Sequence, residues 1–350
     1  MYRLKPSGIE YDNLVQEYKT ASHNEKLSMS KLYGVSLGTL SNWVSQKNIP
    51  QTYQRCSGMS WDGHLEVLKQ IQKATDSHFD IPVRITIEID TDKPVGVCFS
   101  SDWQLGEQGV DYVSFGEDIE VMSKTEGLKV AVGGDGYSNI IQPAKIGSSH
   151  NQAPIVIQKA FYYQTLELLV NNDKCLFVGT GNHNWFSTLM DGEDWDLEVA
   201  KRLNVVYTKH GALVYLKVGD MVYPIFRQHK GRWNSAQNLT NTCKQYQRNY
   251  FPEARIVVVE HDHVAAVEQY TYDNRECVAI RTGTYAVMSD FAQSNGFYGA
   301  RVENPVVVLY PHEDKIVPFK NMTDGITYLT AVRAGQTELT YNVKEEEISI

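Results

Sequence analysis

Five short apolar segments of this chain each end in residues that bind metal ions, and this pattern constrains the fold more than any other feature. The segments are 95–99, 129–132, 176–178, 222–226 and 256–259. The polar residues that follow them are, in the same order, Asp102 with Gln104, Asp135, Asn182 with His183, His229, and His261 with His263. Ligands of open α/β sheets bind beyond the carboxyl ends of the strands, so these side chains can converge. Helical stretches such as 154–171 separate the segments, which indicates an α/β fold.

The residue types at these strand ends suit divalent metal ions. Carboxylate, amide oxygen and neutral imidazole together favour manganese, zinc, iron or nickel over a calcium site built from oxygen ligands alone. His261 and His263 lie one residue apart after an apolar segment. Alternate residues of an extended chain share a face, so we expect both rings to point at one cluster.

The first sixty residues differ from the rest in charge. They contain seven Lys or Arg and four acidic residues, a net charge of +3, which leaves −12 for the remainder of a chain whose total is −9. The protein as a whole is therefore not a basic nucleic-acid binder. A mildly basic head on an acidic body is compatible with DNA contact through the head alone.

The head also has a helical pattern. Asp12, Asn24 and Ser36 can each cap a helix, and the third helix places Leu40 and Trp43 on one apolar face. Gly34 supplies the left-handed geometry of a tight turn before that helix.

The segment 26–49, KLSMSKLYGVSLGTLSNWVSQKNI, resembles the helix-turn-helix domains of phage and bacterial DNA-binding proteins. Met29, Tyr33, Val35, Leu40 and Trp43 occupy the core positions of that motif. The resemblance implies that the third helix enters the major groove of DNA. The residues that would contact DNA are Thr39, Ser41, Asn42, Ser45, Gln46 and Lys47. A three-helix protein-interaction module or a dimerisation cap is the alternative.

Across residues 92–320 the chain resembles the calcineurin-like metallophosphoesterases, whose motifs are DxH, GD, GNH(D/E), H and GHxH in that order. All five regions are present in order, and the residues after His229 read Lys230-Gly-Arg232-Trp-Asn234-Ser, similar to the HKxRxNS motif of the phage branch. Any one motif is weak evidence, and the ordered set is strong. The resemblance implies a four-layer αββα sandwich, preceded by the small all-α helix-turn-helix domain.

The resemblance also implies two divalent metal ions, manganese foremost, with zinc, iron, nickel or magnesium as alternatives. One ion would be held by Asp102, Gln104, Asp135 and His263, and the other by Asp135, Asn182, His229 and His261. His183 would donate a proton to the leaving oxygen or stabilise it, with Asp135 and Asn182 beside it at the catalytic centre. Lys230 and Arg232 would position the substrate phosphate.

Three positions depart from the family pattern. Gln104 replaces the histidine of DxH, Asn184 replaces the carboxylate of GNH(D/E), and Glu260 replaces the glycine of GHxH. We expect a weaker first metal site because of Gln104. We also expect Glu260 either to place an acid near the cluster or to displace the strand end.

The domain organisation expected from these patterns is a helix-turn-helix domain at 1–55, a linker at 56–83, the metallophosphoesterase domain at 84–335 and an acidic tail at 336–350. Five scattered cysteines without a CxxC pair favour reduced thiols in a cytoplasm, which is the host cytoplasm if the gene is carried by a phage. No apolar stretch approaches the roughly 20 residues that cross a bilayer, so we expect no membrane partner. A homo-oligomer remains open.

Three functions compete at this stage. The first is a metal-dependent phosphodiesterase or nuclease acting on DNA delivered by the head. The second is a phosphodiesterase or phosphatase for small nucleotides or phosphoproteins, which the acidic body favours because it repels a long polyanion. The third is a DNA-binding scaffold whose catalysis is weakened by Gln104 and Glu260.

Overall fold

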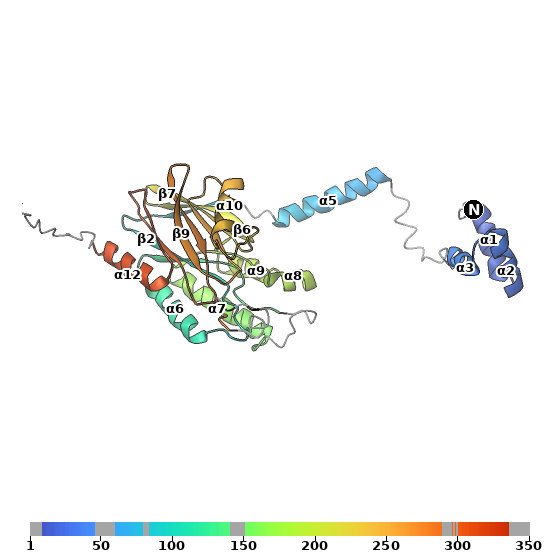
Figure 1. Cartoon of the computed structure of the whole chain (residues 1–350), viewed down its shortest axis with the longest axis horizontal. Helices are drawn as coiled ribbons and strands as arrows, with labels where there is room; N and C mark the ends of the chain where they lie inside the picture. Colours follow the sequence, from blue (N-terminus) through green and yellow to red (C-terminus); the bar gives the residue numbers. More distant parts are fainter. Residues whose placement is uncertain are drawn as a thin grey trace, which may run out of the picture. The chain divides into compact units, whose positions relative to one another are not determined.

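The computed structural model describes residues 9–45, 60–79, 84–140, 151–288, 296, 298 and 300–335. The chain divides into two compact units, Met1–Asp80 and Ile81–Ile350, and Figure 1 colours both along the sequence. The expected domain boundaries at 55, 83 and 335 remain predictions, and the expected acidic tail lies outside the described residues.

The first unit contains the helices α1 (Ile9–Thr20), α2 (His23–Leu32) and α3 (Leu37–Ser45). Leu14, Val15, Leu40 and Val44 form their buried core. The expected core residues Met29, Tyr33, Val35 and Trp43 are only half-buried. An apolar face spaced for a helix therefore identified α3, which packs against both α1 and α2.

The helix caps of this unit agree with the sequence at α3 and differ at α1 and α2. Ser36 caps α3, because its Oγ accepts a hydrogen bond from the backbone N–H of Thr39 at 3.1 Å. Ser22 caps α2 in a reciprocal pair with Glu25, so the cap expected at Asn24 is wrong. Helix α1 begins before Asp12. Gly34 has the expected positive φ, +63°.

A further helix of this unit, α5 (Trp61–Phe79), spans 19 residues and is longer than the short stretch expected near 65–71. Its apolar side chains Trp61, Leu68 and Ile71 are exposed.

The second unit is built on two six-stranded sheets. Sheet A has the order β1-β6-β7-β8-β10-β9, and sheet B has the order β12-β11-β2-β3-β4-β5. The strands of sheet A are β1 (Arg84–Ile89), β6 (Gly211–Val218), β7 (Met221–Gln228), β8 (Ile256–Val259), β9 (Ala266–Tyr272) and β10 (Arg275–Arg281). Those of sheet B are β2 (Val95–Ser100), β3 (Leu128–Val132), β4 (Cys175–Val178), β5 (Val206–Tyr207), β11 (Val306–Leu309) and β12 (Ile316–Phe319).

Helices cover the outer faces of both sheets. Within the described residues of this unit they are α6 (Tyr112–Lys124), α7 (Ile155–Asn171), α8 (Asn184–Asp191), α9 (Trp195–Arg202), α10 (Asn241–Asn249) and α12 (Met322–Arg333). Helices α6, α7 and α12 pack on sheet B, and α10 packs on β8 and β10 of sheet A. Residues such as Val97 of β2 and Ile225 of β7 fill the space between the sheets. The four-layer αββα sandwich, preceded by a small helical unit, is therefore confirmed.

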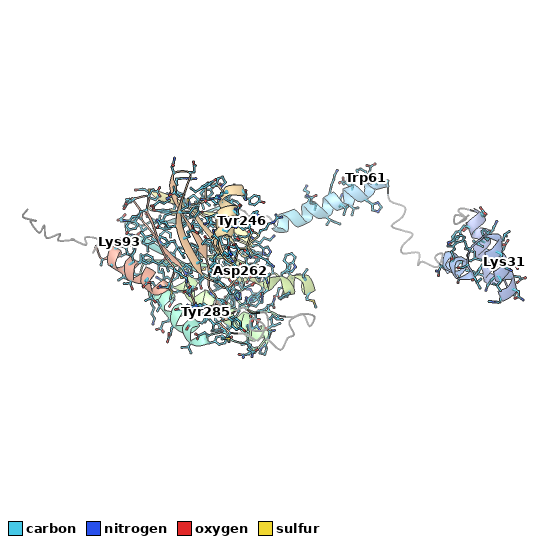
Figure 2. All side chains as sticks on the ribbon, viewed as in Figure 1. Lys31, Trp61, Lys93, Tyr246, Asp262 and Tyr285 are labelled. Atoms are coloured by element: carbon cyan, nitrogen blue, oxygen red, sulfur yellow. The ribbon has the colours of Figure 1, made fainter. Side chains whose placement is uncertain are left out.

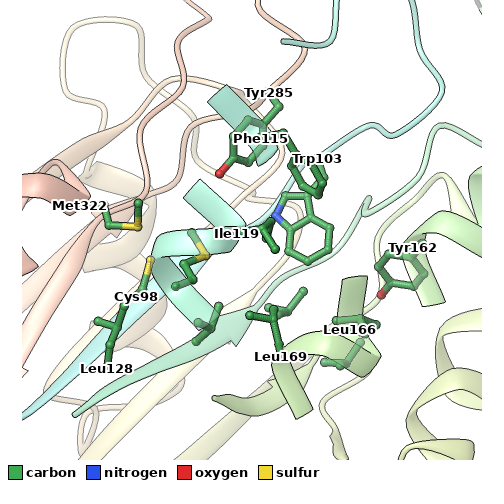
Figure 3. Packing of buried hydrophobic residues seen from close by; sticks show 14 of the residues in the cluster. Cys98, Trp103, Phe115, Ile119, Leu128, Tyr162, Leu166, Leu169, Tyr285 and Met322 are labelled. Carbon is green, nitrogen blue, oxygen red and sulfur yellow. The ribbon is translucent and has the colours of Figure 1, made fainter. Parts of the chain in front are cut away.

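The layer between sheet B and its helices is rich in aromatic residues (Figure 3). Trp103 lies at its centre, with ring centroids 5.4 Å from Phe115 and 6.0 Å from Tyr162 in edge-to-face contacts. Each such pair contributes about 0.5–1.5 kcal/mol beyond the burial of its surface. Because Trp103 follows Asp102 directly, this packing fixes the backbone that carries a candidate metal ligand.

Strand direction brings the predicted ligands together. Strands β2, β3 and β4 are parallel neighbours in sheet B, and β7 and β8 are parallel neighbours in sheet A. Their carboxyl ends therefore present the residues that follow each strand along the edges of the two sheets.

Cys98, Cys175, Cys243 and Cys277 are free thiols, and Cys56 lies outside the described residues. Within the described part of the chain, no helix has both the length and the apolar character that crossing a bilayer requires.

Candidate metal centre

Four of the predicted ligands form one tight cluster. One ligand atom from each of Asp102, Asp135, His229 and His261 lies within 4.8 Å of the others. The first three side chains are buried, and His261 is half-buried. His263 Nε2 lies 3.5 Å from Asp102 Oδ1, so the structure also brings this fifth residue to the cluster.

The backbone carries unusual conformations at this cluster. Asp102, Gln104, Asp135, His261 and His263 all have positive φ angles, between 51° and 78°. Such conformations cost on the order of 1–3 kcal/mol each and tend to collect at functional sites. The extended geometry expected for His261 and His263 is therefore wrong. Strand β8 ends at Val259, and both histidines reach the cluster from left-handed turns.

Three buried ligand atoms have no hydrogen-bond partner within the described residues. They are Asp102 Oδ1, Gln104 Oε1 and His261 Nδ1. Leaving a buried polar atom unpaired costs about 1–3 kcal/mol. Both oxygens carry lone pairs, as does His261 Nδ1 in the tautomer with its proton on Nε2, so a cation would satisfy all three atoms, and the donor set fits a divalent metal ion.

The surroundings of His229 also indicate a bound cation. Its Nδ1 lies 3.0 Å from Glu260 Oε2, and an ionised carboxylate can only accept, so Nδ1 carries the proton. Its Nε2 lies 3.1 Å from both Asp135 Oδ2 and Asn182 Oδ1. Three lone-pair atoms therefore face one another. Burial lowers the pKa of His229, but Asp135 and Glu260 outweigh burial and raise it well above its ordinary value. A proton or a metal ion must bridge this gap.

Asp135 lies at the centre of these contacts. Its Oδ1 accepts a hydrogen bond from the backbone N–H of His183 at 2.9 Å, while Oδ2 faces His229. Burial raises the pKa of Asp135, but the nearby His229 and His183 hold it well below the ordinary value. Gly134 and Gly181 pack against Asp135 and its neighbours so closely that an added Cβ would lie within 2.6 Å of another atom. The GD and GNH glycines therefore allow the two loops to approach.

His183 points its free ring nitrogen toward the cluster. Its Nδ1 donates to the backbone oxygen of Ser138 at 2.5 Å, which leaves Nε2 without the tautomeric proton. Nε2 lies 3.8 Å from Asp135 Oδ2. The His183 side chain is 17% exposed.

Glu260, which departs from the pattern of the similar family, is a buried partner of His229, a candidate metal ligand. It accepts hydrogen bonds from Arg227 Nε at 2.7 Å, Arg227 Nη2 at 2.6 Å and the backbone N–H of Gly134 at 2.8 Å, in addition to His229. Burial raises the pKa of Glu260, but the Arg227 charge holds it at about 2. Glu260 therefore stays ionised and orients His229. It sits near the cluster as expected and does not displace the strand end.

Asn184 is a structural residue. Its side chain accepts a hydrogen bond from Tyr137 OH at 2.6 Å and donates to Thr180 Oγ1 and Asp194 Oδ1. This buried network supports the loop that carries Asn182 and His183.

Asp196 lies beneath the same loop, with its Oδ2 accepting from Thr180 Oγ1 at 2.5 Å and its Oδ1 unpartnered among described residues. Burial raises its pKa to about 7 from 3.8. Because the folded state binds this proton more tightly, the contribution of Asp196 to stability is fully present below about pH 4 and is lost as pH rises to about 7. The loss is at most about 4 kcal/mol.

We expect Asp196→Asn to abolish this part of the pH dependence in denaturant unfolding. Wild-type and variant curves that run parallel across this pH range would contradict it.

The other predicted residues lie outside the cluster. Lys230 and Arg232 are exposed on the loop after His229. Thr39, Ser41 and Asn42 are exposed on α3. Ser45 ends α3, and Gln46 and Lys47 lie outside the described residues.

The role of Arg227 was not predicted from the sequence. An arginine directly after the apolar segment 222–226, near the end of β7, is a usable signal, because a buried guanidinium requires a carboxylate partner.

The fold and this cluster define an α/β sandwich protein with a candidate metal centre. No family model matches the chain, and no curated protein matches it in sequence. Among solved structures, the chain is similar to vacuolar protein sorting 29 from Cryptosporidium parvum, with 13% identity, coverage of 66% of this chain and 100% of that chain, and a TM-score of 0.37. It is also similar to the calcineurin-like phosphoesterase YfkN from Bacillus subtilis, with 9% identity, coverage of 70% and 98%, and a TM-score of 0.38. A metallophosphoesterase from Sphaerobacter thermophilus shows 12% identity, coverage of 68% and 99%, and a TM-score of 0.33.

Proposed function

We propose that this protein is a metal-dependent phosphoesterase whose centre holds two divalent ions. The observation that carries the proposal is the convergence of Asp102, Asp135, His229 and His261 with unpartnered ligand atoms facing inward. Gln104 and His263 would complete one ion's ligands beside Asp102 and Asp135. Asn182 would complete the other's beside Asp135, His229 and His261. When bound, such ions lower the pKa of water and stabilise the charge of a transferring phosphoryl group.

The protein's own groups would then act on the substrate. His183 Nε2, with Nδ1 committed to Ser138, is free to hold and release a proton at the leaving oxygen. Lys230 and Arg232, exposed beside His229, would bind the non-reacting phosphate oxygens. The arrangement suits hydrolysis of a phosphate ester.

We further propose that the substrate is DNA, bound in part by the N-terminal helices. The support is the basic head, the capped turn between α2 and α3, and the exposed polar residues Thr39, Ser41 and Asn42. A small-nucleotide phosphodiesterase or phosphatase is the second candidate, favoured by the −12 charge of the remaining chain.

A gel shift with the full chain tests the role of the head. We expect Thr39→Glu with Ser41→Glu to weaken binding of linear duplex DNA and to lessen its salt dependence, because both changes oppose phosphate contact. Hydrolysis of a small diester should be unchanged. Equal DNA binding by variant and wild type, or no binding by either, would favour the small-nucleotide function.

Gln104 provides a separate test of the two-ion arrangement. It is 1% exposed, and its Oε1 has no hydrogen-bond partner among described residues. A neutral amide is a weaker ligand than imidazole for manganese or zinc, so we expect two unequal sites and activity that requires added metal. Gln104→His should raise occupancy of the weaker site in titration calorimetry. Two equally tight sites in the wild type would contradict this prediction.

A further inference from the structure

Three aromatic rings lie together on the loop and helix that follow His229. We call Trp233, Tyr246 and Tyr250 the aromatic patch. The Trp233 ring centroid lies 5.4 Å from that of Tyr246 and 6.0 Å from that of Tyr250, with the last pair inclined by only 30°. Figure 2 labels Tyr246 on the side-chain view. The patch has an inner anchor, because Tyr246 also packs against Phe226 of β7 at 5.4 Å.

Packing against Phe226 accounts for the position of Tyr246, but it does not account for the exposed rings of the patch. Tyr250 is 53% exposed, Trp233 is half-buried and Arg232 is exposed. The Arg232 guanidinium lies 5.8 Å from the Trp233 ring centroid in a cation–π contact. Rings and cations held at a surface in this way suit a ligand that has both a flat aromatic part and a negative charge.

Two hydrogen bonds from α10 hold the loop that carries Trp233 in place. Asn241 Nδ2 donates to the Trp233 backbone oxygen at 3.1 Å. Tyr246 OH donates to the backbone oxygen of Lys230 at 3.3 Å. The loop is therefore tied to α10 at two points, and Trp233 does not depend on a ligand for its position.

The same loop is tied to the metal centre. Trp233 is four residues after His229. The next residue, Asn234, donates from Nδ2 to Asp262 Oδ1 at 3.2 Å and accepts from Thr242 Oγ1 at 2.9 Å. Asp262, labelled in Figure 2, is the residue between His261 and His263. The patch thus adjoins the candidate centre through its chain connection and through the Asn234–Asp262 bond.

The charges beside the patch are available to an anion. Within the described residues, neither Lys230 nor Arg232 forms an ion pair with a carboxylate, whereas Arg281 and Lys244 nearby are paired with Asp262 and Glu268. Two cations with no carboxylate partner among the described residues therefore lie in the chain between His229 and Trp233.

We infer that the aromatic patch is a base-stacking site, which binds an unpaired nucleobase of a substrate whose phosphate lies at the metal centre. The inference rests on the proposed phosphoesterase activity and names its substrate class as a nucleotide with an unstacked base. Aromatic rings stack on any base, so the site would be tolerant of sequence. A base inside a duplex is covered by its neighbours and cannot reach such a patch, so single-stranded DNA or a free nucleotide fits and intact duplex does not.

The test compares substrates with and without bases. Full-length wild type, Trp233→Ala and Tyr250→Ala are assayed with Mn²⁺ on a short oligothymidylate and on the same oligomer made with abasic sites. We expect each variant to raise KM for the thymidylate about 5- to 100-fold, with the abasic oligomer unaffected. Trp233→Phe and Tyr250→Phe, which keep a ring, should restore most of the KM. Phe161→Ala removes a half-exposed ring from α7 on the opposite sheet and serves as the matched control.

A binding measurement without metal keeps the inference testable if no substrate is cleaved. In chelator, the wild type should bind fluorescent oligothymidylate more tightly than the abasic oligomer, and Trp233→Ala should remove the difference. Competition by thymidine monophosphate would identify a mononucleotide site, and its absence a single-stranded nucleic acid site. Equal binding of both oligomers by folded wild type and variants would overturn the inference. Base-dependent binding without any hydrolysis would overturn the phosphoesterase function and leave the stacking site.

Discussion

Asp135→Asn is expected to lower kcat for phosphodiester hydrolysis by about 10³-fold, because metal-ion stabilisation of the transition state contributes several kcal/mol. Asp135 is the one residue assigned to both ions, and it contacts His229 and the backbone of His183. An asparagine side chain has the same shape but supplies only one neutral oxygen. The same variant should lose most of its divalent metal binding in calorimetry.

Asp273→Asn is a matched control for that experiment. Asp135 and Asp273 both have positive φ, 55° and 51°. Asparagine also tolerates this conformation, so the backbone accepts the substitution equally well at both positions. Asp273 is exposed in the turn between β9 and β10, and its replacement should leave kcat and metal binding unchanged. Wild-type turnover by the Asp135→Asn variant would show that Asp135 is not part of the catalytic centre.

Glu260→Gln is expected to lower both stability and metal affinity. The change leaves the Arg227 guanidinium buried without its charge partner, which costs about 3–5 kcal/mol in the free energy of unfolding. It also removes the carboxylate that holds the Nδ1 proton of His229, and loss of such an orienting partner weakens metal binding about 10- to 100-fold.

Two comparisons separate these effects. Glu253→Gln breaks a more exposed ion pair with Arg84 and should cost less than about 1 kcal/mol, with no change in metal affinity. Calorimetry of Glu260→Gln well below its melting temperature measures the change in metal affinity separately from the change in stability. If the folded variant binds metal as tightly as the wild type, Glu260 supports only the fold and does not position His229.

The sandwich could be predicted from the sequence, and the candidate ligands could be placed at one edge, because both leave local signals. Apolar strands such as β8, which reads IVVV and is fully buried, are followed by candidate ligand residues, and the parallel order of β2, β3 and β4 then brings those strand ends together. The apolar spacing of α3 and the cap at Ser36 were visible in the same way.

Features set by contacts between distant segments could not be predicted. The role of Glu260 depends on Arg227, 33 residues away, and the two meet only because β7 and β8 pair in parallel register. The left-handed turns of His261 and His263 replace the expected extended geometry, and no local pattern distinguishes the two. The aromatic patch likewise depends on how α10 lies against the loop after His229.

The most direct test of the metal-dependent phosphoesterase is hydrolysis of bis-p-nitrophenyl phosphate by metal-stripped protein titrated with Mn²⁺, with bound metal measured in the same samples. The expected result is no hydrolysis in chelator and turnover that rises with metal binding, first at the tighter site and then at the site containing Gln104. Two bound ions per chain without hydrolysis of this diester or of single-stranded DNA would contradict the account. The metal centre would then be a structural one.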